Sequence, residues 1–214
     1  MKIFYVCSWG GCGSKLLCGY LNNFGKAIHI HDPNPPEKLE YIGFKHNRWG
    51  WCPIELPDYE ERYKHVCNRG LEWFNGVPIY EDDENEYFVI FLYRNPVYSI
   101  KSRFWGLNHL ENIRSPLVSI DRVCKERKDI FQINTFYDNY MLKKNKNYKI
   151  YAIKYEHLHE EIDQLNEIFN LRSANVTLEA KKETDRGDRH VNELSDIYSS
   201  VIDKMKKNKF IEII

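Results

Sequence analysis

The stretch from Tyr87 to Tyr93 is apolar without a break, and it narrows the folds that this chain can adopt. Its sequence is Tyr-Phe-Val-Ile-Phe-Leu-Tyr, with no alternation of apolar and polar side chains. A strand of this kind is covered on both faces, as in a parallel sheet between layers of helices. The same run is far too short to cross a bilayer. The sequence therefore predicts a central strand of an α/β domain.

Further strands and helices are expected on both sides of this strand. The pattern predicts strands at 2–7, 27–31, 87–93 and 148–153. It predicts helices at 14–24, 57–74, 96–104, 115–144 (in one or two pieces) and 192–207, and a further helix that follows 155–158 and ends at 169. Strands that alternate with helices favour a parallel sheet. We expect residues 1–214 to form a single three-layer α/β sandwich, with a parallel central sheet covered by helices on both faces.

The composition excludes several classes of protein. The formal net charge is zero, so bulk attraction to nucleic acid or to an anionic membrane is not expected. The six cysteines form no CxxC pair and no zinc spacing. No apolar export signal precedes the first expected strand. We therefore expect a cytoplasmic protein with reduced thiols, and neither a nucleic-acid nor a membrane partner.

A glycine-rich turn follows the first expected strand. Residues Ser8 to Lys15 have the sequence Ser-Trp-Gly-Gly-Cys-Gly-Ser-Lys and lead into an apolar-patterned helix. Backbone N–H groups in such a turn converge on an anion, and the helix N-terminus adds partial positive charge. The Walker A pattern is not met, because Leu16 stands where Ser or Thr would bind magnesium. The turn predicts a phosphate site, with a plain tight turn as the alternative.

A second anion-binding pattern begins at the end of the central strand. Arg94 follows that strand directly, and Ser102 comes eight residues later, two turns into the next expected helix. In α/β folds ligands bind at the carboxyl ends of the strands. A cation and a hydroxyl at this edge suit a second phosphate group. The two patterns together indicate a nucleotide with two separate anionic groups.

In this order and spacing the chain resembles the sulfotransferases that use 3′-phosphoadenosine 5′-phosphosulfate (PAPS). The family's 5′-phosphosulfate loop is matched by Gly11, Cys12, Gly13, Ser14 and Lys15, and its 3′-phosphate motif by Arg94-Asn95-Pro96 with Ser102. A strand followed by Tyr-Glu-x-Leu is matched by 150–158, so the resemblance covers roughly residues 1–171. It implies a P-loop-like fold, PAPS as donor, PAP as product, and a small-molecule or carbohydrate acceptor.

The chain departs from the family at two catalytic positions. Gly11 stands where members carry Lys or Arg, and Lys15 is the nearest replacement. Ala27 stands where heparan-type members carry their catalytic Glu. We expect His31 to act as the base, with His29 or Asp32 as its partner, because imidazole titrates near neutral pH. A pair of hydrogen-bonded structural histidines is the alternative, and nothing in their spacing demands a metal.

A charged loop near the C-terminal end gives a weaker match. Arg186-Gly187 resembles the Arg-Lys-Gly loop that cytosolic members close over the 3′-phosphate, and a solvated loop is the alternative. Two other functions stay open. A small-molecule P-loop kinase using ATP would need a magnesium ligand, for which Asp32 is the only candidate seen at the strand tips. A catalytically inactive nucleotide-binding protein would account for Gly11 and Ala27.

Overall fold

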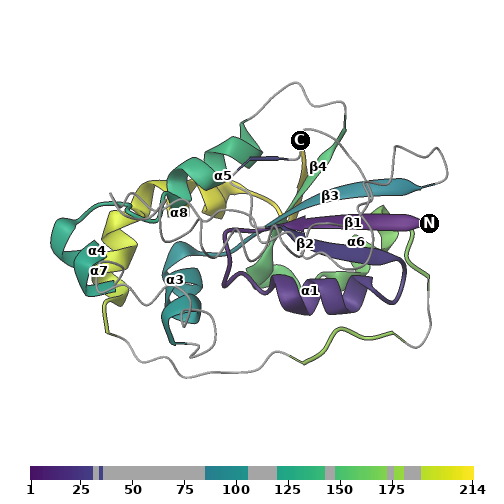
Figure 1. The fold of residues 1–214 in the computed structure, drawn as a ribbon, viewed down its shortest axis with the longest axis horizontal. Coiled ribbons are helices and arrows are strands. Elements are labelled where there is room, and N and C mark those ends of the chain that lie inside the picture. The colour runs from purple at the N-terminus through teal and green to yellow at the C-terminus, as the bar shows by residue number, and fades with distance from the viewer. Residues whose placement is uncertain (31–33, 36–84, 106–119, 143–147, 173–175, 181–188) are drawn as a thin grey trace, which may run out of the picture.

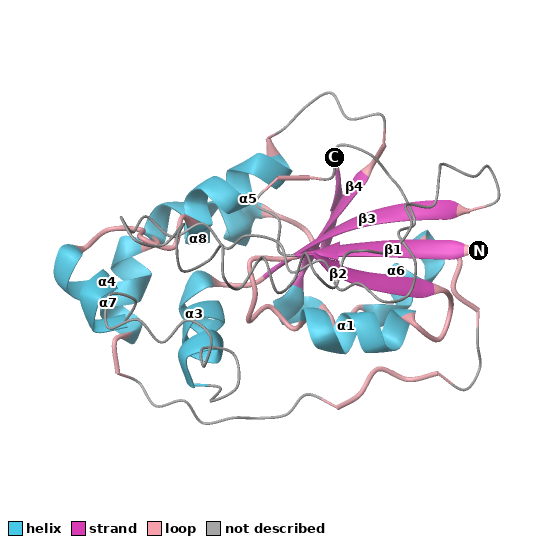
Figure 2. Cartoon of the chain, in the orientation of Figure 1, coloured by secondary structure: helices cyan, strands magenta, loops and turns pink. Residues whose placement is uncertain are grey.

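A computed structural model describes residues 1–30, 34–35, 85–105, 120–142, 148–172, 176–180 and 189–214. These residues form a mixed α/β structure, which Figure 1 shows along the chain and Figure 2 by secondary structure. The strands are β1 (Lys2–Cys7), β2 (Lys26–Ile30), β3 (Glu86–Tyr93), β4 (Ile150–Lys154) and β5 (Ile211–Ile213). The α-helices are α1 (Ser14–Leu21), α3 (Pro96–Trp105), α4 (Ile120–Glu126), α5 (Ile133–Met141), α6 (Ile162–Ile168), α7 (Val191–Ile197) and α8 (Ser199–Lys207), and a 3₁₀ turn, η2, covers Tyr155–His157.

The sheet is mostly parallel. Its strand order is β2-β1-β3-β4-β5, and the first four of these strands run in the same direction. The expectation of a wholly parallel sheet is wrong at one edge, because β5 runs antiparallel to β4. Ile150, the first residue of β4, and Ile214, which follows β5, exchange backbone hydrogen bonds of 3.0 and 2.9 Å. A strand of three residues is too short to produce a recognisable pattern.

Helices cover both faces of the sheet, as the sequence predicts. Successive side chains of a strand point to opposite faces. Ile3, Tyr5 and Cys7 of β1 join a core with residues of α3, α4, α5, α7 and α8. Phe4 and Val6 join a second core with residues of α1 and α6. Figure 1 shows α1 on one side of the sheet and α5 with α8 on the other.

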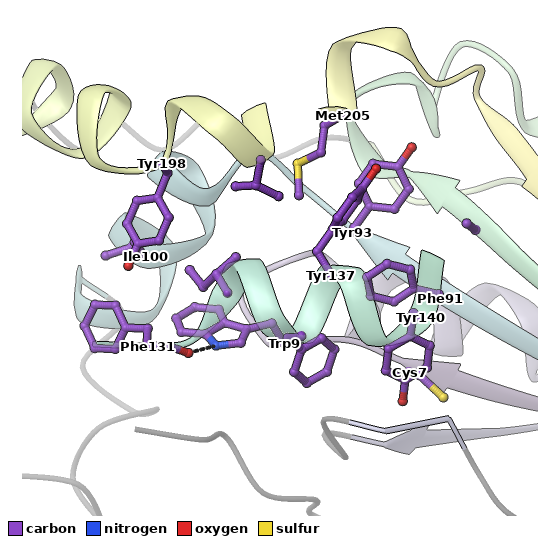
Figure 3. Packing of buried hydrophobic residues seen from close by; sticks show 14 of the residues in the cluster. Cys7, Trp9, Phe91, Tyr93, Ile100, Phe131, Tyr137, Tyr140, Tyr198 and Met205 are labelled. Atoms are coloured by element: carbon purple, nitrogen blue, oxygen red, sulfur yellow. Dashed lines mark hydrogen bonds between the residues drawn. The ribbon is translucent and has the colours of Figure 1, made fainter. Parts of the chain in front are cut away.

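Aromatic rings dominate the first core. The rings of Phe91 and Tyr140 stack with centroids 4.5 Å apart (Figure 3). The ring of Phe136 stacks on Tyr140 with centroids 5.3 Å apart. Such aromatic pairs contribute about 0.5–1.5 kcal/mol beyond their buried area. The hydroxyl of Tyr140 donates to the carbonyl of Asn34 at 3.0 Å. The chain beyond β2 is thereby attached to α5.

The chain changes direction across the sheet between β1 and β3. These two strands are neighbours, with β2 on the far side of β1 and β4 on the far side of β3. The helices that follow them pack on opposite faces, since Leu17 of α1 lies in the second core and Ile100 of α3 in the first. Ligands of open α/β sheets bind where such connections diverge. This point lies at the carboxyl ends of β1 and β3.

Several helices differ from the expected bounds. The first helix ends at Leu21 rather than at 24, and the last expected helix is broken at Tyr198 into α7 and α8. Tyr198 is fully buried, with backbone angles near φ −99° and ψ 13°. The expected helix at 57–74 lies outside the described residues. Among the residues that the structure describes, every helix is too short or too polar to traverse a membrane.

Removing the central ring of the first core should destabilise the fold strongly. Phe91 is 1 % exposed, and Phe91→Ala should lower the free energy of unfolding by about 3–5 kcal/mol, through lost burial and a residual cavity. Leu142→Ala is the matched control, because Leu142 is 65 % exposed and its loss should cost less than about 0.5 kcal/mol. Urea denaturation measures both. Similar losses for the two variants would contradict this core.

Candidate functional site

The glycine-rich loop between β1 and α1 has a backbone that only glycine adopts freely. The φ angles of Gly10, Gly11 and Gly13 are +109°, +65° and +83°. An L-residue with a side chain meets steric hindrance at such angles. Gly13 is the N-cap of α1, and its carbonyl accepts from the amide of Leu17 at 3.1 Å. The three glycines therefore determine how the chain turns from strand to helix.

Three consecutive carbonyls of this loop are held by side chains. The carbonyl of Trp9 accepts from Nη1 of Arg103 at 2.8 Å, and that of Gly10 from Sγ of Cys12 at 3.2 Å. The carbonyl of Gly11 accepts from Nη1 of Arg94 at 3.3 Å. In a trans peptide the N–H points opposite to the C=O. The amides of Gly10, Gly11 and Cys12 therefore point away from the groups that hold these carbonyls.

The loop amides have no hydrogen-bond partner in the described structure. Within the described part of the chain, the amides of residues 10–14 donate to no protein acceptor. The amides at the start of an α-helix also lack intrahelical partners and carry partial positive charge. Unpartnered N–H groups that follow one another in a glycine turn form a concave anion site. The geometry thus suits a phosphate or sulfate group above the loop.

Arg94 joins this loop to the end of β3. Its guanidinium lies over the ring of Tyr155 at 4.6 Å and near the ring of Tyr98 at 5.6 Å. Its Nε atom is buried and has no hydrogen-bond partner among the described residues. Only one of the five guanidinium N–H groups is used by Gly11. The two predicted anion-binding patterns are therefore connected by one hydrogen bond.

Helix α3 presents one polar face to the loop. Ser99 is buried, its hydroxyl lies 3.4 Å from Sγ of Cys12, and it donates to the carbonyl of Arg94 at 3.5 Å. Ser102 and Arg103 follow three and four residues later, so they share this face of the helix. Ser102 is partly exposed there. The structure places Ser102 on the helix face that Arg103 and Ser99 use to contact the loop.

The thiol of Cys12 is a structural donor in this site. Burial raises its pKa above the usual value, and the hydrogen bond with Ser99 opposes this only in part. The thiol therefore stays protonated at neutral pH, and it donates to the carbonyl of Gly10. A protonated, buried thiol is not a nucleophile.

A carboxylate also reaches the site from the end of β4. Oε1 of Glu156 accepts from the amide of Asn95 at 2.8 Å and so fixes the turn between β3 and α3. Its Oε2 atom is buried without a partner among the described residues. The sequence did not indicate this contact, since 61 residues separate the two groups. A carboxylate is thus present at a strand tip where the pattern suggested none.

Of the candidate catalytic residues, the structure describes His29 and Lys15. Nε2 of His29 lies 3.1 Å from the hydroxyl of Ser8, which is fully buried at the start of the loop. Lys15 is exposed in the first turn of α1. His31, Asp32, Arg186 and Gly187 lie outside the described residues. His29 is therefore in contact with the loop.

Two of the glycines are also required by packing. A Cβ on Gly11 would lie 2.4 Å from the carbonyl oxygen of Ser99, and one on Gly13 would lie 2.1 Å from the ring of Tyr155. The basic side chain expected at Gly11 from the family resemblance is thus excluded while α3 keeps this position. The ring of Tyr155 therefore occupies the space that a side chain at Gly13 would need.

Neither similarity to known proteins nor a group of metal ligands identifies the function of this site. Comparison with known proteins found no matching family model, no matching curated protein and no matching solved structure. Among the described residues, no group of three or more His, Cys, Asp or Glu side chains is placed to hold a metal ion. The chemistry of the site therefore follows from its own residues.

Two glycines of the loop and its helix should respond in opposite ways to alanine. Gly13→Ala should lower the free energy of unfolding by roughly 2–5 kcal/mol, from left-handed backbone strain and overpacking against Tyr155. Gly19→Ala is the matched control in α1, with nothing within 4 Å of the added Cβ. It should raise that free energy by about 0.5–1 kcal/mol. Urea denaturation tests both, and a stable Gly13→Ala protein would refute the packing described.

Proposed function

We propose that this chain is a cytoplasmic, PAPS-dependent sulfotransferase with a P-loop-like fold. One observation carries the proposal: a glycine loop whose amides have no partner among the described residues precedes α1, and the arginine at the end of the neighbouring strand donates a hydrogen bond to it. This arrangement suits a nucleotide with anionic groups at two positions. The resemblance of the same residues to the sulfotransferase motifs favours sulfuryl transfer over other reactions of such nucleotides.

Each part of the site has a role in this proposal. Gly11, Cys12, Gly13 and Ser14 bind the 5′-phosphosulfate through their amides, and Lys15 supplies charge near the bridging oxygen. Arg94 and Ser102 bind the 3′-phosphate, and the loop with Arg186 and Gly187 closes over it. The donors that Arg94 leaves unused, including its buried Nε, support its part.

The chemical step needs a nucleophile and a base. The hydroxyl or amine of a small molecule or carbohydrate attacks sulfur in line, and a new bond to sulfur forms. The bond from sulfur to the bridging oxygen breaks, and PAP leaves with its electron pair. His31 takes the acceptor proton, with His29 or Asp32 orienting it. The contact between His29 and Ser8 supports placing these imidazoles beside the loop.

A non-catalytic nucleotide-binding protein is the second candidate. It is favoured by Gly11, because the Ser99 carbonyl occupies the space that a basic side chain would need. Such a protein would bind PAP without transferring a sulfuryl group to any acceptor. A kinase would instead show magnesium-dependent turnover of ATP. Calorimetry with PAP, ATP and NAD, followed by an acceptor screen with PAPS, separates the three.

The 3′-phosphate should decide nucleotide affinity. A charge-assisted contact is worth about 1.5–3 kcal/mol, so PAP should bind roughly tenfold or more tightly than 5′-AMP. Ser102→Ala should reduce this preference and leave affinity for 5′-AMP unchanged. Ser200→Ala, an exposed serine of α8, is the matched control and should change neither affinity. Isothermal titration calorimetry measures the ratio, and equal affinities of the wild type for PAP and 5′-AMP would exclude this assignment.

The base should show in the pH profile. His31→Ala should slow single-turnover transfer from PAPS by about 10²–10⁴-fold, the usual contribution of a positioned base, while PAP still binds. The wild-type rate should rise with pH through the imidazole pKa, because only the neutral ring accepts a proton. His29→Ala should slow the step less, since His29 only orients its neighbour. A normal rate for His31→Ala would move the base to Asp32 or Glu37.

A further inference from the structure

Arg103 makes two contacts with Trp9 and lies close to Gly10 of the glycine loop. Its Nη1 donates to the carbonyl of Trp9 at 2.8 Å, and its guanidinium lies 4.7 Å from the centre of the indole. Its Nη1 also lies 3.1 Å from the point where a Cβ of Gly10 would stand. Neither the glycine pattern nor the Arg94 motif indicates this residue. It comes from the last turn of α3, and 94 residues separate it from Trp9.

We propose that Arg103 is a positioning residue for the 5′-phosphate cradle. It holds the Trp9–Gly10 peptide so that the amide of Gly10 faces the anion. It also places a permanent positive charge next to the loop, where Gly11 supplies no basic side chain. The assignment rests on the proposed function for the identity of the nucleotide. The cradle itself is defined by the loop geometry.

Arg103 fixes the direction of the Trp9–Gly10 peptide. Its C=O points to the guanidinium, so its N–H points away from Arg103. Without Arg103 this carbonyl would lose its charged donor, and the peptide would be free to rotate. The first amide of the cradle would then no longer be fixed.

The side chain of Trp9 is anchored to the first core. Its indole N–H donates to the carbonyl of Phe131 at 3.0 Å, and its ring meets the ring of Phe131 edge-on at 5.6 Å (Figure 3). Phe131 lies just before α5 and belongs to the first core. Trp9 is therefore held by the core through Phe131, and the backbone of Trp9 by Arg103. These two contacts leave the start of the loop little freedom.

The positive charge of Arg103 also acts on the loop. A guanidinium stays protonated at all relevant pH values, and a charged donor to the Trp9 carbonyl polarises the peptide toward a stronger N–H donor at Gly10. Gly10 is required here, because a Cβ would lie 3.1–3.3 Å from three atoms of the Arg103 side chain. The effect acts on the group held by the loop. It should therefore be felt by a 5′-phosphate and not by a 3′-phosphate.

This difference gives a readout that a merely structural role would not produce. The ligands are PAP, 5′-AMP, 3′-AMP and inorganic pyrophosphate, titrated by calorimetry into wild type, Arg103→Met and Arg103→Lys. Arg103→Met should lose roughly tenfold in affinity for PAP, 5′-AMP and pyrophosphate, the usual size of one charged contact, with 3′-AMP unchanged. Arg103→Lys should recover part of the loss. Arg122→Met, in an ion pair with Glu126 on α4, is the matched control and should change nothing.

A second variant keeps the test decisive if Arg103→Met unfolds. Gly10→Ala leaves both arginines in place, but it strains a backbone with φ +109° and brings a methyl group within 3.1–3.3 Å of the Arg103 side chain. It should show the same loss for 5′-phosphate ligands, with 3′-AMP spared. An equal loss for all four ligands, or no loss, would overturn the role of Arg103. Wild type that binds 5′-AMP and PAP equally would refute the proposed function only, whereas wild type that binds neither nucleotide nor pyrophosphate would refute the cradle.

Discussion

The close approach of helix α3 to the glycine loop is the contact on which the rest of the site depends. The carbonyl of Ser99 lies where a side chain on Gly11 would begin, and Arg103 crosses over Gly10. A methyl group at either glycine would push the helix away from the loop. This close approach brings the side chains of Ser99 and Arg103 to the loop, and Ser102 lies on the same face of the helix.

The two cores hold this contact in place from both sides of the sheet. Trp9 connects the loop to the first core through Phe131, and Cys12 is counted among the buried residues of the second core. The loop therefore bridges the two helix layers at the point where β1 and β3 end. Interiors packed at native density transmit small shifts, so a change in either core will move the loop amides. The glycine loop is thus packed from both sides at the end of a doubly covered strand.

The sequence predicts those parts of the fold that have a local signature. The apolar run of β3 and the glycine turn before α1 are both found where expected, and helices cover both faces. The sequence does not predict β5, which has three residues, or the break between α7 and α8 at Tyr198, which is fully buried. It also misses Arg103 and Glu156, because their partners Trp9 and Asn95 are 94 and 61 residues away. Side-chain contacts across such separations leave no trace in periodicity.

The groups left unpaired in this site all lie at the same edge of the sheet. Nε of Arg94 and Oε2 of Glu156 are buried without partners among the described residues, beside a loop whose amides also lack partners there. Burying an unsatisfied polar group costs about 1–3 kcal/mol. Such a cost is tolerated where a ligand removes it, and the donors here outnumber the acceptors. The imbalance favours a ligand rich in acceptor oxygens, which agrees with the proposed phosphorylated nucleotide.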